Sequence, residues 1–237
     1  MDFIDLKSQR LRIETEINTA IAKVLEHGQY ILGPEVTQFE ADLAAFGKAE
    51  HALSCANGTA AIILPLLAWG VGPGDAVFCP SFTYVATAEA IALIGATPVF
   101  VDNDRSTYNM DADSLQAAID GTLQAGELTP RAVITVDLFG QSANYPEIAP
   151  IARAHDLKII ADSAQGFGCS LGGKQPLHWA DITTTSFFPA KPLGCYGDGG
   201  AVLTSGKVDN FTGYSASGST VATQSPERDA QDRLMQI

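Results

Sequence analysis

The chain has 237 residues, of which 46% are hydrophobic and 17% are charged, and this composition excludes a disordered or coiled-coil protein. Its 14 basic and 27 acidic residues give a net charge of −13, which disfavours binding to nucleic acid or to an anionic membrane. No apolar run approaches the roughly 20 residues of a membrane span, and the first residues do not resemble a signal peptide. The four cysteines lack metal-ligand spacing, which favours reduced thiols and no metal site. We therefore expect a cytoplasmic protein.

The N-terminal part predicts two helices. Apolar residues recur at helical spacing over residues 7–27, and Gly28 follows as a stop signal. A shorter helix is expected after Pro34.

Beyond residue 50, apolar runs of strand length alternate with helical segments. The expected strands are 51–56, 76–80, 98–101, 132–139, 158–161, 182–187 and 200–204, and the expected helices are 59–69, 83–94, 113–119 and 145–155. Alternation of this kind, with continuously apolar strands, predicts an α/β fold with a mostly parallel central sheet and helices on both faces. Pro65 predicts a kink or a shortened helix, because proline removes a helix hydrogen bond.

The pattern changes after about residue 205. Residues 206–225 are rich in Gly, Ser and Thr without sustained periodicity, and residues 226–237 are compatible with one short helix. We expect one large domain over residues 1–205 and an irregular polar tail over 206–237.

Ligands of open α/β sheets bind at the carboxyl ends of the strands, so the residues after each strand are the candidates. Asn57, Gly58 and Thr59 follow the first strand and open a helix, whose free N–H groups favour an anion such as phosphate. A capped helix start with a turn glycine explains the same residues. After the next strand, Tyr84 or Phe82 could present a ring to a planar ligand, although packing in the core or at a helix start is the favoured explanation for either residue alone.

Two further residues carry a stronger signal. Asp162 follows a buried strand, where a carboxylate is costly unless it meets a cation or hydrogen-bond donors. Lys191, one of seven lysines, lies among two phenylalanines, two prolines and a leucine. Desolvation lowers the pKa of a lysine and makes its amine nucleophilic. A structural cap and a solvated surface charge are the alternatives for Asp162 and Lys191.

One cofactor fits all of these features together. Pyridoxal phosphate (PLP) needs a lysine for a Schiff base, an acid opposite its ring nitrogen, a phosphate cradle and a ring to stack on. The sequence offers Lys191, Asp162, the turn at Gly58 and Thr59 with Ser186, and Tyr84.

Six stretches, in the same order, resemble the DegT/DnrJ/StrS family of PLP-dependent sugar aminotransferases. They are GQYILGPEVTQFE, CANGT, PSFTYVATAEAI, GATPVFVD, ADSAQGFG and TSFFPAKPLGCYGDGGA, and the resemblance covers residues 1 to about 205. It implies an aspartate-aminotransferase-type large domain (PLP fold type I) and a homodimer with active sites at the subunit interface. The family's small C-terminal domain is expected to be missing, because the family pattern fades after Thr204.

The resemblance also implies a role for each site residue. Lys191 would carry the cofactor and move a proton, and Asp162 would pair with the ring nitrogen. Gln165 would lie near the ring oxygen, and Tyr84 would stack on the ring. Ser186, with the backbone of Gly58 and Thr59, would hold the phosphate.

The implied function is transfer of an amino group from glutamate to a nucleotide-linked keto-sugar for cell-surface polysaccharides such as the lipopolysaccharide O-antigen. The blocks GQYILGPEV, TYVATAE and SFFPAKPLGCYGDGG resemble family members that act on UDP-linked 3-keto-hexuronates. One departure is Ala60, where the family usually has an acidic residue.

Three alternatives remain open at this point. The first is a non-catalytic remnant that folds and binds PLP. The second is a sugar dehydratase of the same family, against which Lys191 argues because those enzymes carry histidine there. The third is a Rossmann-type nucleotide-binding module, which would want GxGxxG after the first strand.

Overall fold

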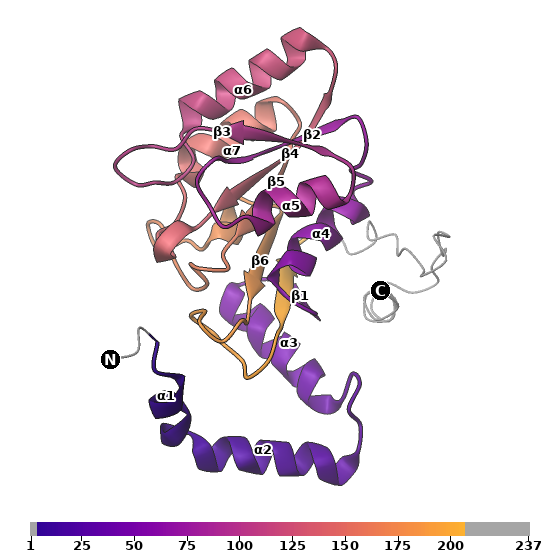
Figure 1. The fold of residues 1–237 in the computed structure, drawn as a ribbon, viewed down its shortest axis with the longest axis vertical. Coiled ribbons are helices and arrows are strands. Elements are labelled where there is room, and N and C mark those ends of the chain that lie inside the picture. The colour runs from indigo at the N-terminus through magenta and orange to yellow at the C-terminus, as the bar shows by residue number, and fades with distance from the viewer. Residues whose placement is uncertain (1–3, 207–237) are drawn as a thin grey trace.

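The computed structural model describes residues 4–206, so all but the first residue of the tail predicted over 206–237 lies outside the described part (Figure 1). Its helices are α1 (Leu6–Arg12), α2 (Glu14–His27), α3 (Pro34–Gly47), α4 (Gly58–Ala68), α5 (Ala86–Leu93), α6 (Ala112–Ala125) and α7 (Tyr145–Ala154), with short 3-10 helices η1 (Leu138–Gly140) and η2 (Pro176–His178). Its strands are β1 (His51–Cys55), β2 (Asp75–Pro80), β3 (Thr97–Val101), β4 (Thr129–Val136), β5 (Lys158–Asp162), β6 (Ile182–Ser186) and β7 (Gly200–Thr204).

The strands form one seven-stranded sheet in the order β1-β7-β6-β5-β4-β2-β3. Only β7 runs antiparallel to its neighbours, β1 and β6, while the remaining pairs are parallel. The carboxyl ends of β1, β2, β4, β5 and β6 therefore lie along one edge of the sheet. The mostly parallel sheet predicted from the sequence is confirmed.

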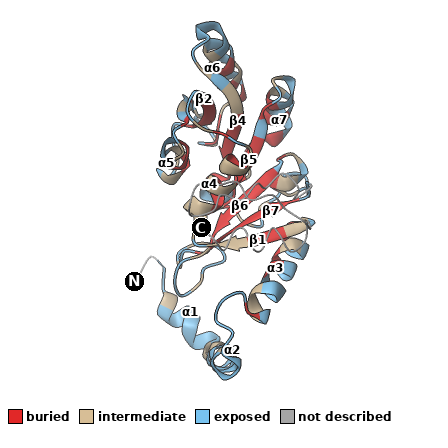
Figure 2. Ribbon diagram, turned by 90° about the vertical axis from the view of Figure 1, so that its right-hand side faces the viewer, coloured by how far each residue is buried: buried red, intermediate tan, exposed pale blue. Residues whose placement is uncertain are grey.

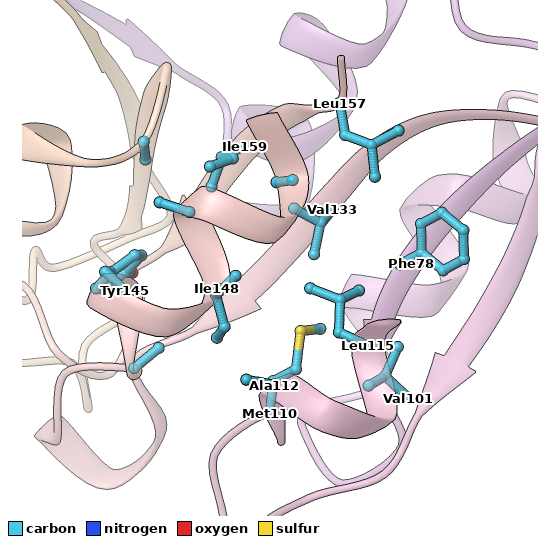
Figure 3. Close-up of a cluster of buried hydrophobic side chains, with 14 of the residues drawn as sticks. Phe78, Val101, Met110, Ala112, Leu115, Val133, Tyr145, Ile148, Leu157 and Ile159 are labelled. Atoms are coloured by element: carbon cyan, nitrogen blue, oxygen red, sulfur yellow. The ribbon is translucent and has the colours of Figure 1, made fainter. Parts of the chain in front are cut away.

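Helices cover both faces of this sheet. Side chains of α6 and α7, including Leu115 and Ile148, pack with Phe78 in one buried cluster, which Figure 3 shows. Side chains of α4 and α5 pack with Val77 in a second cluster. Val77 and Phe78 are neighbours in β2 and point to opposite faces, as the period of two along a strand requires. This two-sided burial explains why the strands read as continuous apolar runs.

The N-terminal region differs from the single helix predicted over residues 7–27. The helix is interrupted at Ile13, whose backbone leaves the helical region at φ −124° and ψ 20°. No residue of α2 is buried, and this helix carries no red in Figure 2. Leu11 of α1 and Ile21 and Leu25 of α2 are exposed. The apolar spacing thus predicted an amphipathic helix correctly, but its apolar face finds no cover within the described residues.

Two smaller predictions are also corrected. Helix α4 continues through the buried Pro65 to Ala68, so the expected shortening is wrong, and the Trp69 N–H closes the last turn on the Pro65 carbonyl at 3.0 Å. The strand predicted over 132–139 ends at Val136, because the chain turns into η1, where Phe139 adopts a left-handed φ of 57°. Within residues 4–206, no helix combines the length and apolar character needed to cross a membrane.

Candidate active site

A cavity of about 390 Å³ opens at the edge where the parallel strands end. Its lining comes from the β1–α4 turn, the segment after β2, the ends of β4, β5 and β6, and the loop after β6. All seven residues predicted from the sequence line it: Gly58, Thr59, Tyr84, Asp162, Gln165, Ser186 and Lys191. The fold therefore brings together side chains that are up to 133 positions apart (191 − 58).

One wall of the cavity is the N-terminus of α4. The Asn57 side chain caps this helix by accepting a hydrogen bond from the Ala60 N–H at 2.8 Å. The N–H groups of Gly58 and Thr59 belong to the first helical turn, which has no acceptor within its own helix. A Cβ built on Gly58 would lie 2.7 Å from the Ser186 Cβ, so only glycine allows the helix to approach β6 this closely. The cap and the anion site proposed from the sequence are thus compatible, because the cap uses the Ala60 N–H and leaves those of Gly58 and Thr59, two residues that line the cavity.

Replacing Gly58 by alanine should push the start of α4 away from Ser186. Overpacking of this kind typically costs about 1–3 kcal/mol, and it should also weaken PLP binding because the two walls of the cradle separate. Urea unfolding and a PLP titration of the variant measure the two effects.

The matched control is Gly121→Ala in the interior of α6. A Cβ on Gly121 meets no atom within 4 Å, so alanine should stabilise the chain by about 0.5–1 kcal/mol and leave PLP binding unchanged. Equal behaviour of the two variants would contradict the role given to Gly58.

Asp162 closes the deep end of the cavity. Its carboxylate accepts hydrogen bonds from the Ala164 N–H at 3.1 Å and from the Thr87 hydroxyl at 3.3 Å. Burial raises the pKa of Asp162 above its usual value, while the Ala164 N–H, the charge of Lys191 and the Thr87 hydroxyl act in the opposite direction. Asp162 is thus a buried acid that a cation in the cavity would stabilise as a carboxylate.

Lys191 reaches the cavity from the loop between β6 and β7. The backbone N–H of Lys191 donates to the Phe188 carbonyl at 2.8 Å. A Cβ on Gly194 would lie 2.4 Å from the Pro189 carbonyl oxygen, so this loop is tightly folded. The Lys191 ammonium lies 5.9 Å from the centroid of the Tyr84 ring, which is within cation–π range.

The two aromatic candidates after β2 separate in the structure. Tyr84 lines the cavity with its side chain exposed, whereas Phe82 packs with Tyr108 and Phe139 at ring-centroid distances of 5.8 and 6.4 Å. On the other side of the cavity, the Gln165 side-chain oxygen accepts a hydrogen bond from the Phe139 N–H at 2.9 Å.

A second cavity of about 600 Å³ shares Gln165, Ala190 and Lys191 with the first. The N-terminal segment from Ile4 to Gln9 contributes its outer wall. Lys191 thus lines two cavities, one at the strand ends and one beside the N-terminal segment.

Sequence reasoning missed several residues of the first cavity, among them Thr83, Phe188 and Asp198. Thr83 directly precedes the predicted Tyr84, and Phe188 lies between the predicted Ser186 and Lys191, so their positions carried a usable signal. Asp198 reaches the cavity only because the loop folds back, which no local pattern indicates.

The chemistry of this donor set fits PLP. The cavity reaches the first turn of α4, where Gly58, Thr59 and Ser186 line it, so a phosphate there would lie at a helix N-terminus. The buried Thr83 hydroxyl at the cavity wall is among the few buried side-chain oxygens of residues 4–206 that have no hydrogen-bond partner. A lysine and a buried acid flank the remaining space, as a ring with an aldehyde and a basic nitrogen requires. The same residues include no cluster of three His, Cys, Asp or Glu side chains that could hold a metal ion.

The fold and the site together define the large domain of a fold-type-I PLP enzyme. Residues 11–212 match the model of the DegT/DnrJ/EryC1/StrS aminotransferase family, and the chain belongs to this family. The resemblance stated from its motifs is confirmed.

Two relatives illustrate the likeness in sequence. The chain is 52% identical to the UDP-2-acetamido-2-deoxy-3-oxo-D-glucuronate aminotransferase of Pseudomonas aeruginosa, over 86% of this chain and 55% of that protein. It is 42% identical to the UDP-N-acetyl-3-dehydro-alpha-D-glucosamine 3-aminotransferase of Acidithiobacillus ferrooxidans, over 85% and 53%. The chain thus spans about half the length of these curated relatives.

Two solved structures illustrate the likeness in fold. A DegT/DnrJ/EryC1/StrS aminotransferase from Brucella abortus superposes with a TM-score of 0.85 at 52% identity, covering 87% of this chain and 55% of that one. NtdA from Bacillus subtilis, solved with bound cofactor PMP, superposes with a TM-score of 0.76 at 31% identity, covering 84% and 44%.

Proposed function

We propose that the protein is a PLP-dependent aminotransferase that transfers an amino group from glutamate to a nucleotide-linked keto-sugar. The observation that carries this proposal is the convergence of all seven predicted residues on one cavity at the carboxyl edge of the sheet. When bound there, the cofactor supplies an electron sink that stabilises negative charge on a substrate carbon.

Each side chain has a task that follows from its position. Lys191 binds the cofactor covalently and moves protons, because it lines both cavities. Asp162 holds a proton on the ring nitrogen, since a buried carboxylate gains most from an adjacent positive charge. The N–H groups of Gly58 and Thr59 and the Ser186 hydroxyl bind the phosphate, Tyr84 covers the ring, and Gln165 contacts the ring oxygen.

For the acceptor, we propose a UDP-linked 3-keto-hexuronate, used in making a cell-surface polysaccharide. The support is the similarity to an aminotransferase named for such a sugar. The second cavity, beneath Ile4–Gln9, adjoins Lys191 and has the volume that a sugar ring needs. The dehydratase alternative is not favoured, because the residue at the cavity is a lysine and not a histidine.

We also propose that the protein works as a homodimer in the cytoplasm, with residues 1–205 as its PLP-binding large domain. Exposed aromatic rings line the two cavities: Tyr84 and Phe188 at the first and Phe139 at the second are each more than half exposed. Together with the uncovered apolar face of α2, they favour a second copy of the chain as the missing cover.

The test is incubation of the purified protein with PLP, glutamate and the keto-sugar nucleotide, followed by detection of 2-oxoglutarate and the amino-sugar. Formation of both products at equal rates is expected. PLP binding without product would favour the non-catalytic alternative. A preference for a neutral 4-keto-6-deoxy sugar would overturn the acceptor while leaving the transaminase assignment standing.

A further inference from the structure

A second buried carboxylate lies directly beside Asp162. Asp137 follows β4 as Asp162 ends the neighbouring strand β5, and the Asp137 N–H donates to the Asp162 carbonyl at 2.9 Å. Asp137 is fully buried and does not line the cavity. A buried carboxylate of this kind is costly unless its hydrogen bonds are satisfied, so its partners indicate what it does.

Three donors from three segments satisfy this carboxylate. The Ala143 N–H and the Tyr145 hydroxyl both donate to the same carboxylate oxygen of Asp137, Oδ1, each at 2.9 Å. The Ser163 hydroxyl donates to the other oxygen through a short hydrogen bond. Asp137 therefore ties the turn after β4 and the start of α7 to the turn after β5.

The turn after β5 carries two of the proposed cofactor contacts. Ser163 directly follows Asp162, and Gln165 comes two residues later. A Cβ on Gly166 would lie 2.5 Å from the Asp137 Cβ, so residues 162–166 wrap closely over Asp137. From the other side, Phe139, two residues after Asp137, donates its N–H to the Gln165 side chain. Both proposed contacts are thus held by the segment that Asp137 anchors.

The charges around Asp137 fit this role. Burial raises the pKa of Asp137 to about 6, and the nearby charge of Asp162 adds to the rise. The other titratable groups that face it are Tyr145 and Cys169, and burial raises the pKa of each, that of Cys169 to about 12. Both stay neutral at pH 7, so Tyr145 remains a hydrogen-bond donor to Asp137.

We propose that Asp137 is a positioning residue that, through Ser163, orients Asp162 and Gln165 toward the bound cofactor. The proposal rests on the function proposed above. This inference goes beyond that function, because it says that Asp137, a residue outside the cavity, orients the acid that faces the ring nitrogen.

The experiment compares two variants that each remove one hydroxyl from the same carboxylate. Ser163→Ala frees the side that faces Asp162, and Tyr145→Phe frees the side that faces α7. Ser163→Ala should weaken PLP binding about tenfold and shift the absorption maximum of bound PLP, whereas Tyr145→Phe should change PLP affinity by less than about twofold. Both should lower the unfolding temperature of the apo protein.

Equal effects of the two variants on affinity, or an unchanged absorption maximum in Ser163→Ala, would overturn the positioning role and leave a structural one. Failure of the unmodified protein to bind PLP would instead overturn the proposed function itself, and this inference with it.

A third variant, Asp137→Asn, tests the charge while keeping a carbonyl oxygen for the Ala143 N–H. The folded-state pKa of about 6 lies above the ordinary value of 3.8, so the folded state binds more protons between these two pH values. Stability of the apo protein should therefore fall as pH rises from about 4 to about 6, and Asp137→Asn should lose this part of the pH dependence. An unchanged pH profile would show that Asp137 does not titrate between these two pH values.

Discussion

Replacing Lys191 by alanine should abolish transamination and remove the covalent attachment of PLP. Loss of a positioned proton-transfer group alone typically costs about 10²–10⁴-fold in rate, and loss of the covalent link adds to this. The fold should survive, because the Lys191 side chain is only half-buried and belongs to none of the buried apolar clusters of residues 4–206. Steady-state kinetics and the visible spectrum with PLP measure the effect.

Sodium borohydride gives a second readout, because it reduces a Schiff base to a stable amine that a peptide map can locate. The modified peptide should contain Lys191 in the unmodified protein and be absent from Lys191→Ala and Lys191→Arg. Lys174→Ala is the matched control: its ammonium lies 6.0 Å from the Trp179 ring centroid, much as Lys191 faces Tyr84, but it does not line the cavity. A reduced peptide at Lys158 or Lys174 would overturn the assignment.

Most of the candidate site could be predicted from the sequence, because the order of strands along the chain indicates which residues lie at the edge of a parallel sheet. Every parallel strand ends at the same edge, so the residues after strands converge whatever their separation along the chain. Gly58, Asp162 and Ser186 follow this rule directly. Lys191 lies five residues beyond β6, too far for this rule to identify it. Its apolar neighbours in the sequence identified it instead.

The same rule shows why Asp137 was overlooked. The predicted strand ran on to residue 139, so Asp137 was interpreted as part of the strand when it is in fact the first residue after it. Leu138 and Phe139 kept the apolar pattern going, although Phe139 is exposed in the turn. The apolar pattern shows only which residues are apolar. It gives no sign of the left-handed backbone at Phe139, in the turn that follows this strand.

The N-terminal helices show a different limit. Apolar spacing predicts that a face will be buried, but it does not say against what. For α6 and α7 the partner is the sheet of the same chain, and the prediction succeeded. For α2 no residue is buried within residues 4–206, so the same signal predicted the helix correctly, but this part of the chain does not bury its apolar face.

Asp162→Asn should still bind PLP but transfer amino groups about 10²–10⁴-fold more slowly, because a neutral amide cannot hold a proton on the ring nitrogen. The amide keeps an oxygen for the Ala164 N–H, and the Thr87 hydroxyl can turn to accept from the new N–H₂ group. The apo protein should be no less stable at pH 7 than the unmodified one. Burial raises the folded-state pKa of Asp162, so its ionised form opposes folding above that pKa.

Thr87→Val is the matched variant for this prediction, because it removes a hydrogen bond to Asp162 and leaves the charge in place. Loss of one hydrogen bond to a charged group corresponds to about a tenfold effect, well short of that expected for Asp162→Asn. If the charge is what matters, the rates should fall in the order unmodified, Thr87→Val, Asp162→Asn, and a chelator should change none of them. An unchanged rate in Asp162→Asn, or a rate lost on adding the chelator, would instead point to a metal and against a ring nitrogen as the partner of this carboxylate.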